Sequence, residues 1–188
     1  MIKEIFIRNM VCDRCIKVLR TEFKNEDIDL IEIELGRIKV GIKNESQFER
    51  IIAILEDDGF SIIKSPKKKL VEKVKIELIH ILEQVPFGLE ENLSSFLSKK
   101  LKKEYSKISK TFSFIEEVTI EKYFIKLKIE KVKELIQSQE YNFTQISQML
   151  DYKHLNHLSK QFKNETGMSL TDYKLNRKGG RKSLDKII

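Results

Sequence analysis

The sequence predicts a small α+β domain followed by an all-α region. In residues 1–64 apolar side chains alternate with polar ones, the period of half-buried strands, and two stretches between them have helical spacing. Beyond residue 65 the alternation stops and the apolar stripes recur at helical spacing. The charge of the chain changes sign at the same place. Residues 1–64 hold 11 Lys/Arg and 13 Asp/Glu, a net charge of −2. Residues 65–188 hold 25 Lys/Arg and 16 Asp/Glu, a net charge of +9. The basic excess favours a polyanionic partner for the second part.

The elements of residues 1–64 are expected in the order βαββαβ. Gly36-Arg37 supplies the hairpin turn between the second and third strands, and Asp58-Gly59 ends the second helix. Strands are expected at 5–7, 31–35, 38–42 and 60–63, and helices at 15–23 and 48–55. This order is that of the ferredoxin-like unit, so an α+β ferredoxin-like N-terminal domain is predicted.

The rest of the chain is expected to be helical. Ser65-Pro66 and three lysines mark a boundary, and residues 65–88 form a helical linker whose helix ends before Pro86. Ser169 and Asp172 form a capping-box pattern that opens a final helix. Helices are expected before it near 92–101, 106–116, 119–138, 143–150 and 154–164, and a loose basic tail at 177–188.

The helical part contains an internal repeat at an offset of 50 residues. The matched positions are Leu93 with Phe143, Phe96 with Ile146, Ile108 with Leu158, Ser109-Lys110 with Ser159-Lys160, Phe112 with Phe162, Val118-Thr119-Ile120 with Met168-Ser169-Leu170, and Tyr123 with Tyr173. Each copy reads as a short helix, a tight turn, a second short helix and a capped third one. This is the arrangement of a helix-turn-helix unit.

Residues 89–176 resemble the DNA-binding domain of the AraC family, which has two such units. The second unit carries the resemblance in FTQISQMLDYKHLNHLSKQFKNETGMSLTDYK, and EKYFIKLKIEKVKELI resembles the connecting helix. Two positions depart from the pattern: Glu117 stands where the second copy has Gly167, and Asp151 stands where the family usually has glycine. Aspartate tolerates a positive φ at little cost. The resemblance implies a sequence-specific transcription regulator whose partner is double-stranded DNA.

The resemblance also implies which residues face DNA. The second reading helix would start near Lys153, with Leu158 and Phe162 in the core. The positions expected to face DNA are Lys153, His154, Asn156, His157, Lys160, Gln161 and Lys163, and in the first copy Ser106, Lys107, Lys110 and Thr111. Lysine and asparagine can bond base edges. A connecting helix of roughly 30 Å would place the two reading helices about one DNA turn apart. A solvated basic face without a ligand is the alternative interpretation of these lysines.

A cysteine pair follows the first predicted strand. Asn9-Met10-Val11-Cys12-Asp13-Arg14-Cys15 is similar to the GMxCxxC loop of heavy-metal-associated domains, with Asn9 in place of glycine. The resemblance implies a sensor domain over residues 1–64 with Cys12 and Cys15 as metal ligands. A helix N-terminus is expected to lower the thiol pKa of Cys15. Two soft thiolates favour Cu(I) or another thiophilic ion, and a homodimer could share one ion. A redox dithiol and a buried packing pair are the alternatives.

Other function classes lack their signatures. We find no nucleophile–base arrangement, phosphate-binding glycine loop or isolated pair of acids, which predicts a non-enzyme without a small-molecule substrate. The longest apolar run, Ile51–Leu55, is too short for a membrane span, and no secretory signal precedes it, which predicts a cytoplasmic protein that does not bind membranes. The competing hypothesis is a metal carrier whose basic helices dock an acidic protein, but docking needs no duplicated reading helix.

Overall fold

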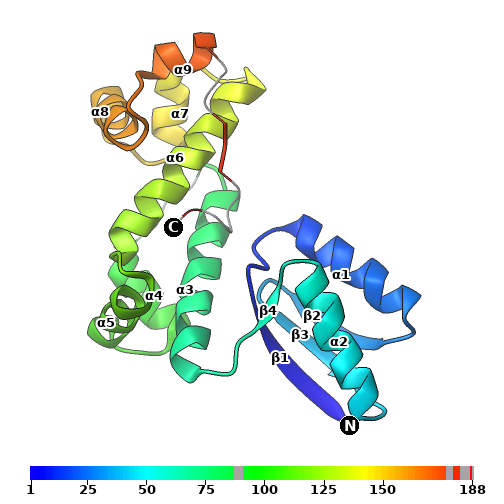
Figure 1. Ribbon diagram of the computed structural model, residues 1–188. Coiled ribbons are helices and arrows are strands. Elements are labelled where there is room, and N and C mark those ends of the chain that lie inside the picture. The colour runs from blue at the N-terminus through cyan, green and yellow to red at the C-terminus, as the bar shows by residue number, and fades with distance from the viewer. Residues whose placement is uncertain (87–90, 177–179, 183–186, 188) are drawn as a thin grey trace. The chain divides into compact units, whose positions relative to one another are not determined.

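The computed structural model describes residues 1–86, 91–176, 180–182 and 187 (Figure 1). The chain divides into two compact units, Met1–Ile76 and Glu77–Ile188. The division falls inside a single helix, α3 (Pro66–Glu83), whereas the sequence suggests a boundary just before that helix. Each unit is therefore described separately.

The first unit is a four-stranded antiparallel sheet with two helices. Its elements are β1 (Ile2–Arg8), α1 (Asp13–Asn25), β2 (Asp29–Glu34), β3 (Arg37–Gly41), α2 (Glu45–Asp57) and β4 (Ser61–Ile62), and the strand order is β2-β3-β1-β4. The order of elements along the chain is the predicted one. Alternate strand residues such as Ile7 and Ile38 join Leu19, Phe23 and Ile51 of the two helices in one buried cluster. The strand alternation seen in the sequence therefore marks the face that α1 and α2 cover.

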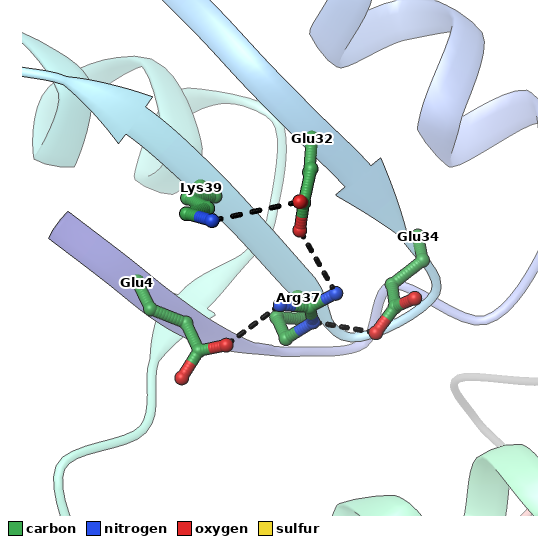
Figure 2. A network of polar contacts seen from close by, with 5 residues as sticks. All are labelled: Glu4, Glu32, Glu34, Arg37 and Lys39. Carbon is green, nitrogen blue, oxygen red and sulfur yellow. Dashed lines mark hydrogen bonds and ion pairs between the residues drawn. The ribbon is translucent and has the colours of Figure 1, made fainter. Parts of the chain in front are cut away.

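The hairpin between β2 and β3 differs from the prediction by one residue. Leu35 and Gly36 form the turn, and Gly36 has a φ of 68°, which favours glycine. Arg37, expected in the turn, is the first residue of β3. Its guanidinium bridges acidic side chains on two other strands, Glu4 of β1 at 2.6 Å and Glu32 of β2 at 3.2 Å (Figure 2). Ion pairs to both neighbouring strands favour placing Arg37 within the sheet.

The second unit is helical in its described part. After the last residues of α3 it contains α4 (Leu93–Leu101), α5 (Tyr105–Glu116), α6 (Ile120–Ser138), α7 (Phe143–Met149), α8 (Leu155–Thr166) and α9 (Leu170–Asn176). The central helix is α6, which contacts α5, α7 and α8 and buries residues along its whole length. Its buried Glu130 accepts a hydrogen bond from Lys133 at 2.6 Å, so each charge is compensated. No helix in the described part of the chain has the length and apolarity that crossing a bilayer requires.

Side-chain caps explain where several helices begin. Asn92, Thr119 and Asn142 each accept a hydrogen bond from the backbone N–H three residues later. At α9 the Ser169 hydroxyl oxygen accepts from the Asp172 N–H at 3.0 Å, while the Asp172 carboxylate accepts from the Ser169 N–H at 3.3 Å. This reciprocal pair is the capping box predicted from the sequence.

Part of the C-terminal tail packs on α6. Residues 177–179, 183–186 and 188 of the expected loose tail lie outside the described residues. Arg181 pairs with Glu134 at 2.7 Å, the Lys182 N–H donates to Glu130 at 2.8 Å, and Ile187 is buried. In its described residues the tail is thus held by carboxylates of α6, which the sequence alone did not indicate.

Candidate nucleic-acid interface

The two copies of the repeat build the same small core twice. Ile108 and Phe112 of α5 are fully buried, as are Leu158 and Phe162 of α8. The Phe112 ring packs on Tyr123 with centroids 5.5 Å apart, and the Phe162 ring packs on Tyr173 at the same distance. Matching sequence positions therefore hold matching packing positions, so the first copy keeps the geometry of the second despite its divergent sequence.

The turns keep their backbone geometry even where glycine is absent. Glu117 and Gly167 end α5 and α8 with φ values of 57° and 75°, and each N–H caps the helix that it ends. Asp151, in the turn between α7 and α8, has a φ of 55°. Glu117 and Asp151 thus retain the left-handed conformation without glycine, at a cost of about 1–2 kcal/mol for Glu117 and less for Asp151.

The helix predicted to be the second reading helix is α8, and it exposes a polar face. Its N-cap residue is His154, so it begins at Leu155, two residues after Lys153, which lies in the preceding turn. Leu158 and Phe162 turn into the core. Asn156, Lys160 and Lys163 recur at helical spacing on the opposite side and are exposed. Lys153, His154 and His157 are also exposed, whereas Gln161 is half-buried.

The helix predicted to be the first reading helix is α5. Ser106, Lys107 and Lys110 are exposed on it. Thr111 is half-buried, and its hydroxyl donates to the Lys107 carbonyl at 2.7 Å within the same helix. Lys102 and Lys103 of the preceding turn are exposed as well and extend the basic surface, although the sequence reasoning did not select them. The lysine run from 99 to 103 was the signal that could have identified them.

Helix α6 separates the two reading helices. The first, α5, lies by one end of α6, and the second, α8, lies towards the other end (Figure 1). With 19 residues, α6 spans roughly 28 Å at 1.5 Å per residue. Two major-groove segments on one face of B-DNA are about 34 Å apart. The length of α6 is therefore comparable to one turn of B-DNA.

The cysteine pair lies at the start of α1 in the first unit. Cys12 is the N-cap residue and Cys15 lies in the first turn; both are half-buried, and their sulfurs are 3.3 Å apart. The Cys15 thiol also donates to the Asn9 carbonyl at 3.9 Å. Burial, aided by the hydrogen bond with Cys12, raises the pKa of the Cys15 thiol. The expectation of a lowered pKa was therefore wrong for Cys15, because desolvation outweighs the backbone hydrogen bonds that favour the thiolate.

The cysteine pair supplies two possible metal ligands, the sulfurs of Cys12 and Cys15. Among the described residues there is no group of three or more His, Cys, Asp or Glu side chains placed to hold a metal ion. Met10 of the loop is buried in the core of the first unit. Asn9, which replaces the glycine of similar loops, has a φ of 70° and donates its side-chain amide to the Gly59 carbonyl at 3.4 Å. Asparagine therefore occupies a left-handed position that favours glycine, and its side chain adds one hydrogen bond.

Comparison with known proteins finds a matching family model and similar solved structures. The family model described as "Helix-turn-helix domain" matches residues 97–176. The C-terminal domain of AraT, a response regulator from Geobacillus stearothermophilus, is similar at 18% identity with a TM-score of 0.50, over 63% of this chain and 92% of that chain. A DNA-binding transcriptional dual regulator from Escherichia coli K-12 is similar at 15% identity with a TM-score of 0.49, over 57% and 90%. No curated protein matches the sequence. Residues 97–176 therefore form a helix-turn-helix domain.

Proposed function

We propose that the protein is a sequence-specific transcription regulator of the AraC type that binds double-stranded DNA through α5 and α8. The observation that carries this proposal is the duplicated unit, in which each copy exposes a polar, lysine-bearing helix face above the same buried core. A basic surface alone would also suit an acidic protein partner. Two such faces, joined by a helix about as long as one DNA turn, favour a duplex.

The two kinds of polar side chain on α8 have different roles in this proposal. Asn156 and Lys160, near the start and middle of the helix, face base edges in the major groove, where asparagine and lysine make specific contacts. Lys163, near its end, faces phosphate and supplies affinity without sequence preference. Ser106, Lys107 and Lys110 occupy the equivalent side of α5.

Alanine substitutions on α8 test this placement. Asn156→Ala and Lys160→Ala should each weaken binding to the specific site by about 1–3 kcal/mol, because each loses a base contact. Lys163→Ala should weaken binding to specific and random duplexes alike. Lys17→Ala is the matched control, since it removes one exposed positive charge from α1. Electrophoretic mobility shifts with both kinds of duplex measure the effects, and parent-like binding by all three α8 variants would place the helix outside the groove.

For the first unit we propose a ferredoxin-like, heavy-metal-associated type of sensor domain in which Cys12 and Cys15 hold Cu(I). The support is the donor set: two sulfurs converge to 3.3 Å at the half-exposed start of α1. Soft thiolates in low coordination number favour Cu(I). With two donors on one chain, a second copy could complete the coordination, so metal would favour a homodimer that engages paired DNA sites.

Anaerobic titration with Cu(I) tests the sensor. The parent should bind the ion tightly, and a Cys12→Ser/Cys15→Ser variant should not. Cu(I) should change the DNA affinity of the parent by about 5- to 150-fold, the usual range of coupling between two sites. Sedimentation velocity would follow the oligomeric state during the same titration. Identical responses of parent and variant would show that this pair does not bind the effector; a response of the parent to oxidant alone would favour redox sensing.

A further inference from the structure

The loop that leads to the cysteine pair is held at Asn9 from three directions. The Asn9 N–H donates to Oε1 of Glu72, on α3, at 3.3 Å. Its side-chain amide donates to the Gly59 carbonyl at 3.4 Å, and its own carbonyl accepts from the Cys15 thiol at 3.9 Å. The φ of 70° at Asn9 is a left-handed conformation that is costly for most residues other than glycine. The three bonds therefore hold a strained backbone position three residues before Cys12.

The bond to Glu72 comes from outside the segment predicted to form the sensor. That segment ends at residue 64, whereas the first compact unit extends to Ile76 and includes the first part of α3. The Lys69 ammonium lies 4.3 Å from the centroid of the Phe6 ring, which is on the sheet face opposite α1 and α2 because the neighbouring residues of β1 belong to the buried cluster. At the β2–β3 turn, a Cβ on Gly36 would overlap Cδ1 of Ile76. Glu72 thus lies on a part of α3 that packs directly on the sheet.

Glu72 is a buried carboxylate that bonds to this loop. The residue is 5% exposed, and burying a carboxylate is costly unless hydrogen bonds or opposite charges compensate it. An apolar side chain could fill such a space without that cost, so packing alone does not explain a glutamate here. A thiolate that binds a metal has no proton to donate, so the bond from Cys15 to Asn9 is then lost. The bond to Glu72 does not depend on the thiol proton, so Glu72 can hold Asn9 while the cysteines serve as ligands.

We propose that Glu72 is a positioning residue for a metal ion at the cysteine pair: by accepting from the Asn9 N–H, it holds the loop so that the sulfurs of Cys12 and Cys15 stay together. The proposal rests on the sensor function proposed above. It makes α3 a part of the sensor, although this helix follows the βαββαβ segment. Groups that bond directly to metal ligands typically contribute 10–100-fold to metal affinity. Because Glu72 acts through the loop, we expect a contribution of about 10-fold.

Anaerobic competition for Cu(I) between the full-length protein and a colorimetric Cu(I) chelator tests the proposal. Three substitutions separate the hydrogen bond from the charge. Glu72→Gln keeps an acceptor at the same reach without the charge, and its Cu(I) affinity should match that of the parent. Glu72→Asp keeps the charge but is one methylene shorter, and Glu72→Met keeps neither, so both should bind Cu(I) about 10-fold more weakly. Hydrogen exchange of the Asn9 amide, followed by NMR, should be faster in these two variants and unchanged in Glu72→Gln.

The matched control is Glu49→Met, which removes an exposed carboxylate from α2 in the same unit and should leave Cu(I) affinity unchanged. Parent-like affinity in both Glu72→Asp and Glu72→Met would overturn the positioning role. Equal weakening in Glu72→Gln and Glu72→Met would also overturn it, by assigning the effect to charge. An affinity that follows the melting temperature across the series would overturn it by assigning Glu72 to stability. If the parent itself does not bind Cu(I) tightly, the proposed sensor fails, and this inference fails with it.

Discussion

Raising the salt concentration from 50 to 200 mM should weaken binding of the full-length protein to DNA by about 10³- to 10⁵-fold. A loss of this size corresponds to roughly 6–10 phosphates neutralised, with condensed counterions released at each. The helix-turn-helix domain has enough exposed lysines in its two copies for such a contact set: Lys99, Lys100, Lys102, Lys103, Lys107, Lys110, Lys153, Lys160 and Lys163. Fluorescence anisotropy with a labelled duplex at several KCl concentrations measures this dependence. Its result is the slope of the logarithm of the binding constant against the logarithm of the KCl concentration.

Single substitutions show how much each lysine contributes to this salt dependence. Lys163→Ala should reduce the log–log slope by about 1, because one phosphate contact is lost. Lys17→Ala, which removes the same charge from the net-acidic N-terminal region, should leave it unchanged. A slope near zero for the parent would contradict the electrostatic basis of the proposed interface, and an equal decrease in both variants would show that the slope reports net charge and not contact.

The repeat was predictable because burial constrains the residues that carry it. Phe112 and Phe162 each fill a core position against a tyrosine, and few side chains fit there, so the match persists at an offset of 50 residues. The alternation of apolar residues predicted the strands of the first unit for the same reason. Element boundaries were less certain: α8 begins at Leu155 after His154, a residue that gives no strong N-cap signal.

The electrostatic details were not predictable from local sequence. The raised pKa of the Cys15 thiol depends on burial, which the residues next to it do not specify. The bond between Asn9 and Glu72 depends on how α3 packs on the first unit, because the two residues are 63 positions apart in the sequence. Arg37 joins Glu4, 33 residues away, because the two strands pair. Each feature follows from tertiary contacts that periodicity and propensity do not encode.

Phe162→Ala should destabilise the folded protein by about 3–5 kcal/mol. The Phe162 ring is fully buried and packs on Tyr173, so the substitution leaves a cavity in the small core beneath α8. A domain has about 5–15 kcal/mol of stability in total, so this loss is a large share of it. The expected consequence is partial or complete unfolding of the second helix-turn-helix unit near 37 °C and loss of specific DNA binding. Urea unfolding followed by circular dichroism measures the change.

Two further substitutions separate packing from other causes. Phe112→Ala makes the equivalent change in the first copy and should cost a similar amount, because its ring packs on Tyr123 at the same centroid distance. Phe114→Ala removes a phenylalanine that is 79% exposed on α5 and should change stability by no more than about 0.5 kcal/mol. If Phe112→Ala proved nearly neutral while Phe162→Ala was costly, the first copy would lack the closed core described here. The degenerate sequence of that copy would then reflect a real loss of packing.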